Sequence, residues 1–534
     1  MRLTILRVVT LGFALSVPFV FSSSLTPPTG AKEAKLPAII KVAPQPPAFT
    51  DSERLAELAQ RRARVAQAIG SKGFLILFSA EPRVYTNDVD YPYRQENNLY
   101  YLSQLKQKGA TLVLLPGNAQ FPEILFMPRR DPSLETWTGH MYSPQEAKQV
   151  SGIKEIWHSS ELDPFLKSIR NRQPYRPKAE NILLSDLPAS FQFTNGNGFE
   201  PLFAAAAQED ASLFMLIPRE VESREYKQEQ RFVSDWAKTP SGFGLRNAWR
   251  IFNEMRLSKS PMELRLLQHA IDISIEAHER SWVAAADAKW EYEVDAVVAY
   301  TFKLRNADNW GYPDIVGCGP NATTLHYIES QAPVKSGELL LMDVGAEYEH
   351  YSADVTRTFP VNGRFSPVQA QIYQIVYDAQ EAVANASRPG ATLADVNRAG
   401  TDVIKEGLLK LGLITDKNSM QHRLWFMHGT SHWLGMNVHD VGGGSKFVSG
   451  AVFTNEPGIY IRPDALEYKP FGLTDADWEK FKAAVRPAFE KYRGIGVRIE
   501  DDLVITADGV EWMTKALPRK ISDIEAFIAK ARSS

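Results

Sequence analysis

Histidines and acidic residues gather in the second half of the chain in a pattern that suits metal binding. Four of the ten histidines, His422, His428, His432 and His439, lie within 18 residues, where even spacing would place about a third of one. Glycines between them favour tight loops over a regular helix. The segment is not a helical HExxH zinc motif, because Gly429 stands where that motif has its glutamate.

Four carboxylates accompany these histidines at the ends of strand-like apolar runs. Asp343 directly follows the apolar residues 339–342, and Asp354 opens a segment that we expect to return as a second strand of a hairpin. Glu456 and Glu500 also have strand-like apolar neighbours. An acidic side chain in such a setting is costly to bury unless something positive compensates it. Taken singly, each of these acids could instead end a strand and cap a turn.

Together, four carboxylates and one imidazole form a hard, oxygen-rich ligand set. Such a set suits two divalent cations about 3.5 to 4 Å apart, which lower the pKa of water and polarise a carbonyl group. This is the chemistry of amide hydrolysis. We therefore predict two divalent metal ions, with Mn²⁺ favoured by the oxygen ligands and Zn²⁺ or Co²⁺ as alternatives.

The whole chain has the composition of an ordinary globular protein. It has 534 residues, 44% of them hydrophobic and 23% charged, which excludes disordered, collagen-like and multi-span membrane classes and predicts two to four domains. The net charge of -3 and the lack of a basic stripe argue against nucleic acid as a partner. The single cysteine, Cys318, excludes an intramolecular disulfide.

The N-terminus predicts export. Arg2 and Arg7 precede an apolar stretch over residues 8–21, which is too short to span a bilayer but suits a signal peptide, and small residues follow at 22–24. We predict a signal peptide over residues 1–24, a periplasmic or secreted protein, and no membrane span in the mature form. An uncleaved anchor or a buried helix is the alternative. Six prolines within residues 25–48 predict an extended spacer.

Helix and strand signals divide the remainder into two domains and a tail. Asp51 and Ser52 predict the start of a helix that ends near Ile69, and apolar runs at 74–78, 111–115 and 124–127 predict strands, the last two joined by a turn. A second helical start at Ser260 and Pro261 places a domain boundary near residue 257. The predicted ranges are residues 49–256, 257–520 and a C-terminal tail at 521–534.

Five short motifs resemble those of the pita-bread metallopeptidases, in the branch of Xaa-Pro aminopeptidase and prolidase. They are Met-Asp-Val-Gly at 342–345, Ala-Asp-Val-Thr-Arg at 353–357, His-Gly-Thr-Ser-His-Trp-Leu-Gly at 428–435, Asn-Glu-Pro-Gly at 455–458 and Arg-Ile-Glu-Asp at 498–501. The resemblance extends over most of residues 50–520. It implies a protein of the α/β (α+β) class, with an N-terminal creatinase-like mixed α/β domain followed by a pita-bread metallopeptidase domain.

The resemblance also implies roles for single residues. Asp354 and Glu500 would bridge the two metals, and Glu456 would also act as general base and proton shuttle for the attacking hydroxide. His326 matches the histidine on the leaving-group side of the scissile bond, and His439 matches the one that steadies the substrate carbonyl. The implied metal ligands are Asp343, Asp354, His432, Glu456 and Glu500.

Two further residues are assigned by the same resemblance. His428 is similar to the histidine that lines the proline pocket, and Arg498 to the arginine that orients the bridging carboxylates. Both are also compatible with a purely structural role. His422 matches no position of the family, so we interpret it as a surface or core residue.

The chain departs from the family between two predicted ligands. Residues 461–492 look like an insertion, in which Thr474 and Asp477 form a helix start and Pro487 is expected to kink or end the helix. Apolar residues recur there at helical spacing. The insertion could serve as a lid over the cleft, limit peptide length, form a dimer contact or be a surface helix.

The function implied by the resemblance is a two-metal exopeptidase. It would remove the N-terminal residue from peptides with proline in second position, and the protein would form a dimer or tetramer. One alternative is a prolidase restricted to Xaa-Pro dipeptides. The other is a catalytically inactive pita-bread module that only binds peptide or protein.

Overall fold

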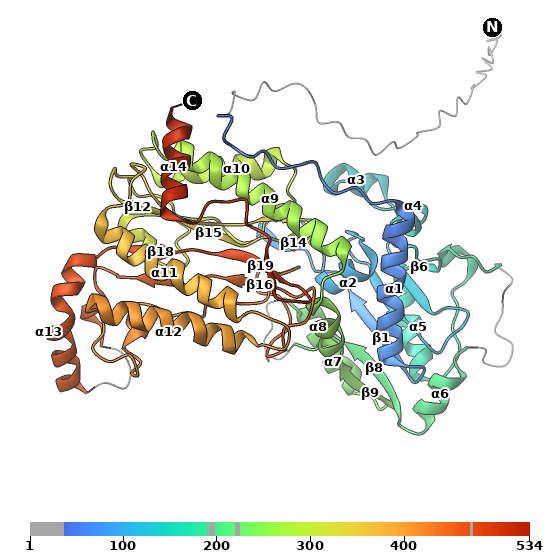
Figure 1. Cartoon of the computed structure of the whole chain (residues 1–534). Coiled ribbons are helices and arrows are strands. Elements are labelled where there is room, and N and C mark those ends of the chain that lie inside the picture. Colours follow the sequence, from blue (N-terminus) through green and yellow to red (C-terminus); the bar gives the residue numbers. More distant parts are fainter. Residues whose placement is uncertain (1–36, 189–190, 192–197, 219–224, 470–473, 534) are drawn as a thin grey trace, which may run out of the picture.

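The computed structural model describes residues 37–188, 191, 198–218, 225–469 and 474–533. The predicted signal peptide and the first part of the predicted spacer lie outside these residues. Figure 1 shows an N-terminal part in blue to green beside a larger part that runs from green to red. Across the described ranges, none of the helices is both long enough and apolar enough to cross a membrane.

A seven-stranded mixed sheet forms the N-terminal part. Its order is β7-β6-β5-β4-β1-β8-β9, with β4 antiparallel to β1 and β5, and β8 parallel to β1 and β9. This confirms the strand, turn and strand predicted before residue 128 and the mixed α/β class. The strands are β1 Gly73–Phe78, β4 Thr111–Leu114, β5 Glu123–Met127, β6 Ile156–His158, β7 Ile182–Leu184, β8 Ala211–Met215 and β9 Phe243–Asn247, and β2 Val84–Thr86 pairs with β3 Val89–Asp90 in a separate hairpin.

The central strand β1 is buried on both faces. Its side chains alternate, so Leu75 and Leu77 join the main core of the molecule while Phe74, Ile76 and Phe78 join a second core. A continuous apolar run is expected for a strand covered on both sides. The helices of this part are α1 Asp51–Ile69, α2 Asn97–Ser103, α3 Pro132–Thr138, α4 Pro144–Ser151, α5 Leu162–Arg170, α6 Glu200–Ala207, α7 Lys227–Ala237 and α8 Trp249–Leu257.

The first helix corrects one sequence prediction. Thr50 is its N-cap, not Asp51 or Ser52, and the Thr50 side chain accepts a hydrogen bond from the Glu53 backbone N–H at 3.2 Å. The Glu53 carboxylate in turn accepts from the Thr50 backbone N–H at 2.8 Å. This reciprocal pair satisfies two free donors and fixes the start, and Asp51 then lies in the first turn, where negative charge is favourable.

The larger part sandwiches short sheets between two pairs of helices. Figure 1 shows β12, β15, β16, β18 and β19 between α9 and α10 on one side and α11 and α12 on the other. The helices are α9 Pro261–Ala284, α10 Glu291–Leu304, α11 Pro367–Ala386, α12 Leu393–Leu411, α13 Asp475–Tyr492 and α14 Ile521–Arg532. The strands are β10 Asn309–Trp310, β11 Ile315–Cys318, β12 Leu339–Val344, β13 Ala346–Tyr348, β14 Tyr351–Ser352, β15 Val355–Pro360, β16 Val452–Asn455, β17 Gly458–Tyr460, β18 Gly496–Arg498, β19 Asp501–Ile505 and β20 Val510–Trp512.

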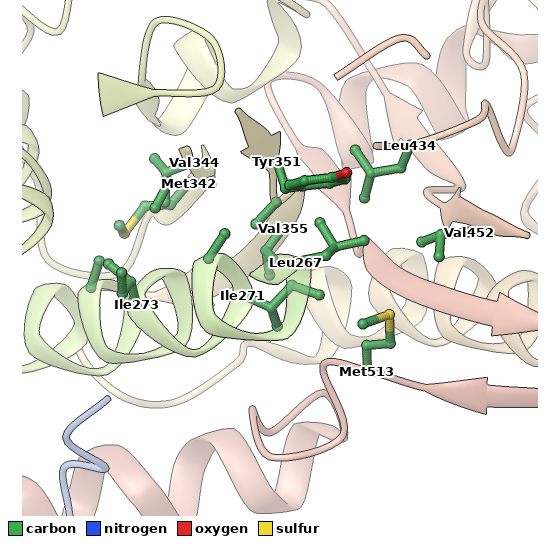
Figure 2. Close-up of a cluster of buried hydrophobic side chains, with 14 of the residues drawn as sticks. Leu267, Ile271, Ile273, Met342, Val344, Tyr351, Val355, Leu434, Val452 and Met513 are labelled. Atoms are coloured by element: carbon green, nitrogen blue, oxygen red, sulfur yellow. The ribbon is translucent and has the colours of Figure 1, made fainter. Parts of the chain in front are cut away.

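Helix α9 supports the strands that carry the predicted acids. It starts with a capping box between Ser260 and Glu263, with Pro261 in its first turn, as the sequence predicts. Figure 2 shows its residues Leu267 and Ile271 among buried side chains of β12, β15 and β16. This packing holds one face of β12 and β15 rigidly against α9, so that side chains on the other face are held in place.

The segment before the first helix differs from a free spacer. In the described part, Ile40 and Ala43 are buried against the main core. The backbone N–H of Ala43 donates to the Glu276 carboxylate of α9 at 2.7 Å, and that of Lys41 donates to Glu279. Proline removes backbone donors from this segment, but two of the donors that remain, those of Lys41 and Ala43, find acceptors on α9. Residues 37–48 therefore dock on the larger part.

The predicted insertion contains a helix that proline does not end. Helix α13 begins after its N-cap Thr474 and continues through Pro487 to Tyr492, so the expectation that Pro487 ends it was wrong. Pro487 and Ala483, whose carbonyl loses a donor, are both exposed, so water can satisfy that carbonyl. The Tyr492 hydroxyl donates to the Gln371 side chain of α11 at 2.6 Å. The helix thus packs on the outside of the helical layer.

Candidate metal centre

A tight hairpin brings two of the predicted ligands together. Asp343 lies near the end of β12 and Asp354 immediately precedes β15, and the two strands pair antiparallel. Gly345 allows the hairpin to close, because a Cβ there would lie 1.9 Å from the Ala353 carbonyl oxygen. Both carboxylates are at most one-tenth exposed. The returning strand confirms the predicted hairpin geometry, with β13 and β14 inserted at its tip.

The remaining ligand candidates converge on this hairpin from later parts of the chain. A bridge between Thr356 and Glu500 places Glu500 beside β15, and the Thr356 hydroxyl donates to the Glu500 carboxylate at 2.6 Å. Ligand atoms of Asp354, His432 and Glu500 all lie within 4.8 Å of one another. His432 Nε2 is 3.2 Å from Asp354 Oδ2 and 3.4 Å from Glu456 Oε1. The five predicted metal ligands therefore lie close together, with Asp343, Asp354 and Glu500 buried and His432 and Glu456 partly exposed.

Backbone pairing holds the segment from Thr430 to His432 alongside Thr454 and Glu456. The Thr454 N–H donates to the His432 carbonyl at 2.9 Å, and the Glu456 N–H donates to the Thr430 carbonyl at 2.8 Å. The His432 Nδ1 lies 3.1 Å from the Trp433 carbonyl oxygen, so Nε2 is the nitrogen that faces the carboxylates. A loop rich in glycine, as the sequence predicts, can follow this extended path.

Arg498 ties the cluster to its surroundings. Its guanidinium donates to Asp343, to the Thr356 hydroxyl at 3.1 Å and to the Tyr460 hydroxyl at 2.9 Å, and its Nε lies 3.9 Å from Glu500. A planar guanidinium can hold several acceptors in fixed directions at once. Arg498 therefore contacts Asp343 directly and lies beside Glu500.

The other predicted histidines lie around the cluster in different settings. His428 Nδ1 is 3.5 Å from Glu456 and its Nε2 is 2.8 Å from the Tyr460 hydroxyl. The ring of His439 packs on His432 with centroids 4.2 Å apart. His326 lies in an exposed turn, close enough to His439 for its charge to lower the pKa of that residue.

His422 lies apart from this group. It is buried, and its Nδ1 is 3.3 Å from the Ser419 carbonyl oxygen, so of the two interpretations from sequence the core residue applies.

Three of the carboxylates in the cluster have raised pKa values, as expected for a site that binds cations. Burial raises the pKa of Glu456 to about 7, and burial together with neighbouring carboxylates raises the pKa values of Asp354 and Glu500. Burial alone would lower the pKa of His432, but Asp354 and Glu456 outweigh it and raise that pKa to about 9. Buried carboxylates that repel one another and take up protons fit bound divalent cations, which would remove the repulsion.

Burial keeps two of the surrounding histidines neutral. It lowers the pKa of His428 to about 3, with Arg498 adding to the effect, and it lowers the pKa of His439 to about 4. Both imidazoles are therefore uncharged at neutral pH. The neutral imidazole of His439 can donate one hydrogen bond to a substrate oxygen without placing another positive charge beside the cations.

Sequence reasoning missed three residues that contact the cluster. The Tyr312 hydroxyl donates to Asp343 at 2.5 Å, Tyr460 links His428 to Arg498, and Asp502 accepts from the Asp354 backbone N–H at 3.1 Å. Nothing in the residues near Tyr312 signals this contact. Tyr460, in contrast, lies two residues after Gly458 in a predicted ligand motif, and side-chain alternation could have directed attention to it.

Comparisons with known proteins agree with both parts of the structure. The sequence profile of Metallopeptidase family M24 matches residues 265–507, and that of the Aminopeptidase P N-terminal domain matches residues 58–176. Xaa-Pro aminopeptidase of Escherichia coli (strain K12) is 31% identical over 487 residues, which span 89% of this chain and 98% of the relative. This chain belongs to metallopeptidase family M24. The cluster is accordingly a binding site for divalent metal ions.

Solved structures show the same two-part architecture. Aminopeptidase P from Escherichia coli with the inhibitor Pro-Leu superposes with a TM-score of 0.73 at 30% identity, covering 91% of this chain and all (100%) of that one. Aminopeptidase PepP of Pseudomonas aeruginosa gives a TM-score of 0.72 at 29% identity and covers 91% of this chain and 99% of that one. The predicted fold, a creatinase-like N-terminal domain before a pita-bread domain, is confirmed.

Proposed function

We propose that this member of family M24 is a metal-dependent aminopeptidase that removes the first residue from peptides with proline second. The observation that carries the proposal is the complete cluster of four carboxylates and His432, set in a chain that resembles Xaa-Pro aminopeptidases along almost its whole length. Bound divalent metal ions activate water and polarise the scissile carbonyl. The ligands are Asp343, Asp354, His432, Glu456 and Glu500.

The residues of the chain supply orientation and proton transfer. Glu456 can accept a proton from the attacking water and return it to the leaving nitrogen of proline. The neutral His439 donates to the substrate carbonyl oxygen, and His326 faces the leaving group. His428, held by Tyr460, borders the ring of the second-position proline.

Two alternatives remain from the sequence, and both are less well supported. A prolidase would cleave only dipeptides, but the relatives that span nearly the whole chain are aminopeptidases. An inactive module would be expected to lack ligands, and this chain retains every predicted one in a single cluster.

The experiment compares an Xaa-Pro dipeptide, an Xaa-Pro-Yaa tripeptide and a proline-free tripeptide as substrates after chelation and metal addition. We expect cleavage of the proline tripeptide only with metal, and none in Asp354→Ala. Cleavage of the dipeptide alone would make the protein a prolidase. No turnover with Mn²⁺, Zn²⁺ or Co²⁺ would support the binding module.

We further propose Mn²⁺ as the metal, because four of the five ligands offer oxygen. Metal analysis of protein purified without chelator tests this, and zinc at equal or higher occupancy would contradict it.

Export to the periplasm or medium is proposed from Arg2, Arg7 and the apolar stretch 8–21. N-terminal sequencing of the native protein should give a sequence that begins after residue 24.

Assembly into a dimer or tetramer is proposed from the family resemblance alone and is tested by measuring the mass of the protein in solution.

A further inference from the structure

A cavity of about 690 Å³ lies between the N-terminal part and the metal-binding part. Segments within 79–97 and 225–229 line one side, and Tyr312 and His439 form its inner end. The Tyr312 hydroxyl donates directly to the metal-ligand candidate Asp343. The cavity therefore opens onto the metal centre, and its volume is in the range of about 300–1,000 Å³ usual for small-ligand sites.

The position of the cavity identifies which part of a substrate enters it. His428 and Tyr460, assigned to the proline side, do not line it, whereas Tyr312 and His439 do. In the proposed reaction, the proline and all later residues extend from the scissile bond towards His428. The side chain of the first residue is left to point into the cavity.

Five glutamates and two arginines are among the residues that line the cavity, and most of these glutamates already have hydrogen-bond or ion-pair partners. Glu347 pairs with Arg94 at 2.8 Å, and Glu81 pairs with Arg231 at 2.6 Å. Glu96 is the N-cap of α2 and accepts hydrogen bonds from its first turn. These acids are therefore already engaged by other residues of the protein.

Glu229 of α7 differs from the other carboxylates. It lines the cavity and is only 6% exposed, its carboxylate accepts a hydrogen bond from its own backbone N–H, and no ion pair joins it to a cation among the described residues. Burial raises the pKa of Glu229 to about 7, and Glu96 and Glu81 add to the increase. The cavity cation Arg83 is engaged by Glu225 at 3.2 Å.

We propose that Glu229 selects a cationic side chain, lysine or arginine, at the first position of the substrate. A buried carboxylate without a cation beside it is costly, and an incoming ammonium or guanidinium group reduces that cost. The carboxylates that surround Glu229 strengthen the attraction. This inference rests on the proposed aminopeptidase function and names the class of peptide that the site prefers.

The test compares kcat/KM for Lys-Pro-Ala and norleucine-Pro-Ala, whose first side chains share an aliphatic stem but differ in charge. We expect wild type to favour lysine by about tenfold or more, and Glu229→Gln to abolish this preference while it still turns over norleucine-Pro-Ala. Asp235→Asn is the matched control, because it removes the same charge from an exposed position on α7 and should leave the preference intact.

The pH dependence of the same ratio gives an independent readout. Both substrates share the metal chemistry, so its titration cancels in the ratio. Because only the ionised Glu229 attracts a cation, the lysine preference of wild type should decline as the pH falls below about 7. Glu229→Gln should show a flat ratio.

The results of these experiments distinguish a failure of the role proposed for Glu229 from a failure of the proposed aminopeptidase function. Equal turnover of both substrates, a preference for neutral or acidic first residues, or an unchanged preference in Glu229→Gln would overturn the role of Glu229 and leave the aminopeptidase standing. No turnover of any proline-second tripeptide would overturn the proposed function itself. Turnover of norleucine-Pro-Ala by Glu229→Gln also shows that the variant is folded.

Discussion

Arg498 holds the metal cluster through contacts that lysine cannot reproduce. Its guanidinium reaches Asp343, Thr356 and Tyr460 at once from a side chain only 5% exposed. We expect Arg498→Lys to lower activity or metal affinity by about 10- to 100-fold. Arg462→Lys, at an exposed pair with Asp464, is the control and should be neutral. Full activity of Arg498→Lys in a metal titration would contradict the orienting role.

The cluster also predicts how the metal-free protein responds to pH. Glu456 is raised from 4.5 to about 7 and His432 from 6.5 to about 9, so the folded state binds more protons than the unfolded chain across this range. The free energy of unfolding should therefore fall as pH rises, on the order of 2 kcal/mol between pH 5.5 and 8. Denaturant unfolding of chelated protein measures it. Glu456→Gln should weaken the trend, and a rise in stability with pH would refute it.

Much of the site could be predicted from the sequence, because its chemistry depends on residue type. Asp343, Asp354 and Glu500 stand out as acids at the ends of apolar runs, and the histidines as a dense local group. Tyr312 could not be predicted, since its contact with Asp343 exists only once β10 and β12 lie close in the fold. The sequence did not single out Glu229 either, because the lack of a cation beside its carboxylate depends on which residues the fold places around it.

At the scale of elements, α13 shows how context overrides a local rule. Proline removes one backbone hydrogen bond from the helix, but the helix buries Trp478, Phe481 and Val485 and continues past Pro487. We expect Pro487→Ala to restore that hydrogen bond and stabilise the protein by up to about 3 kcal/mol. Thermal unfolding tests this, with Ala488→Gly as a destabilising comparison. A lower melting temperature for Pro487→Ala would mean that the proline shapes the helix.

The presence of a strand or helix was easier to predict from the sequence than the residue at which it starts. The apolar runs of β1, β4 and β5 and the start of α9 follow from sequence, because burial and capping act locally. The start of α1 at Thr50 was missed in favour of two equally good capping residues. The docking of residues 37–48 was missed because it depends on Glu276 and Glu279 of a distant helix.

At the scale of the molecule, the buried ion pair between Arg256 and Asp440 is one of the contacts that join the two parts. Arg256 of α8 lies 2.5 Å from Asp440, next to His439, and donates to Asn98 of α2 at 2.8 Å. Arg256→Met would leave Asp440 buried with only Lys259 at 3.5 Å, so we expect a loss of about 3–5 kcal/mol of stability.

The matched control for this prediction is Arg250→Met on the same helix, where the side chain is 89% exposed. Denaturant unfolding of both variants gives the comparison. Equal stability of the two would show that the pair of Arg256 and Asp440 contributes nothing to holding the parts together.

The most direct single measurement is product analysis of one tetrapeptide, Lys-Pro-Ala-Ala, by mass spectrometry after chelation and addition of Mn²⁺. The account predicts free lysine and Pro-Ala-Ala as the only products, formed only when metal is present, and no cleavage of the N-acetylated peptide. Cleavage at any other bond, cleavage of the acetylated peptide, or products without metal would contradict it.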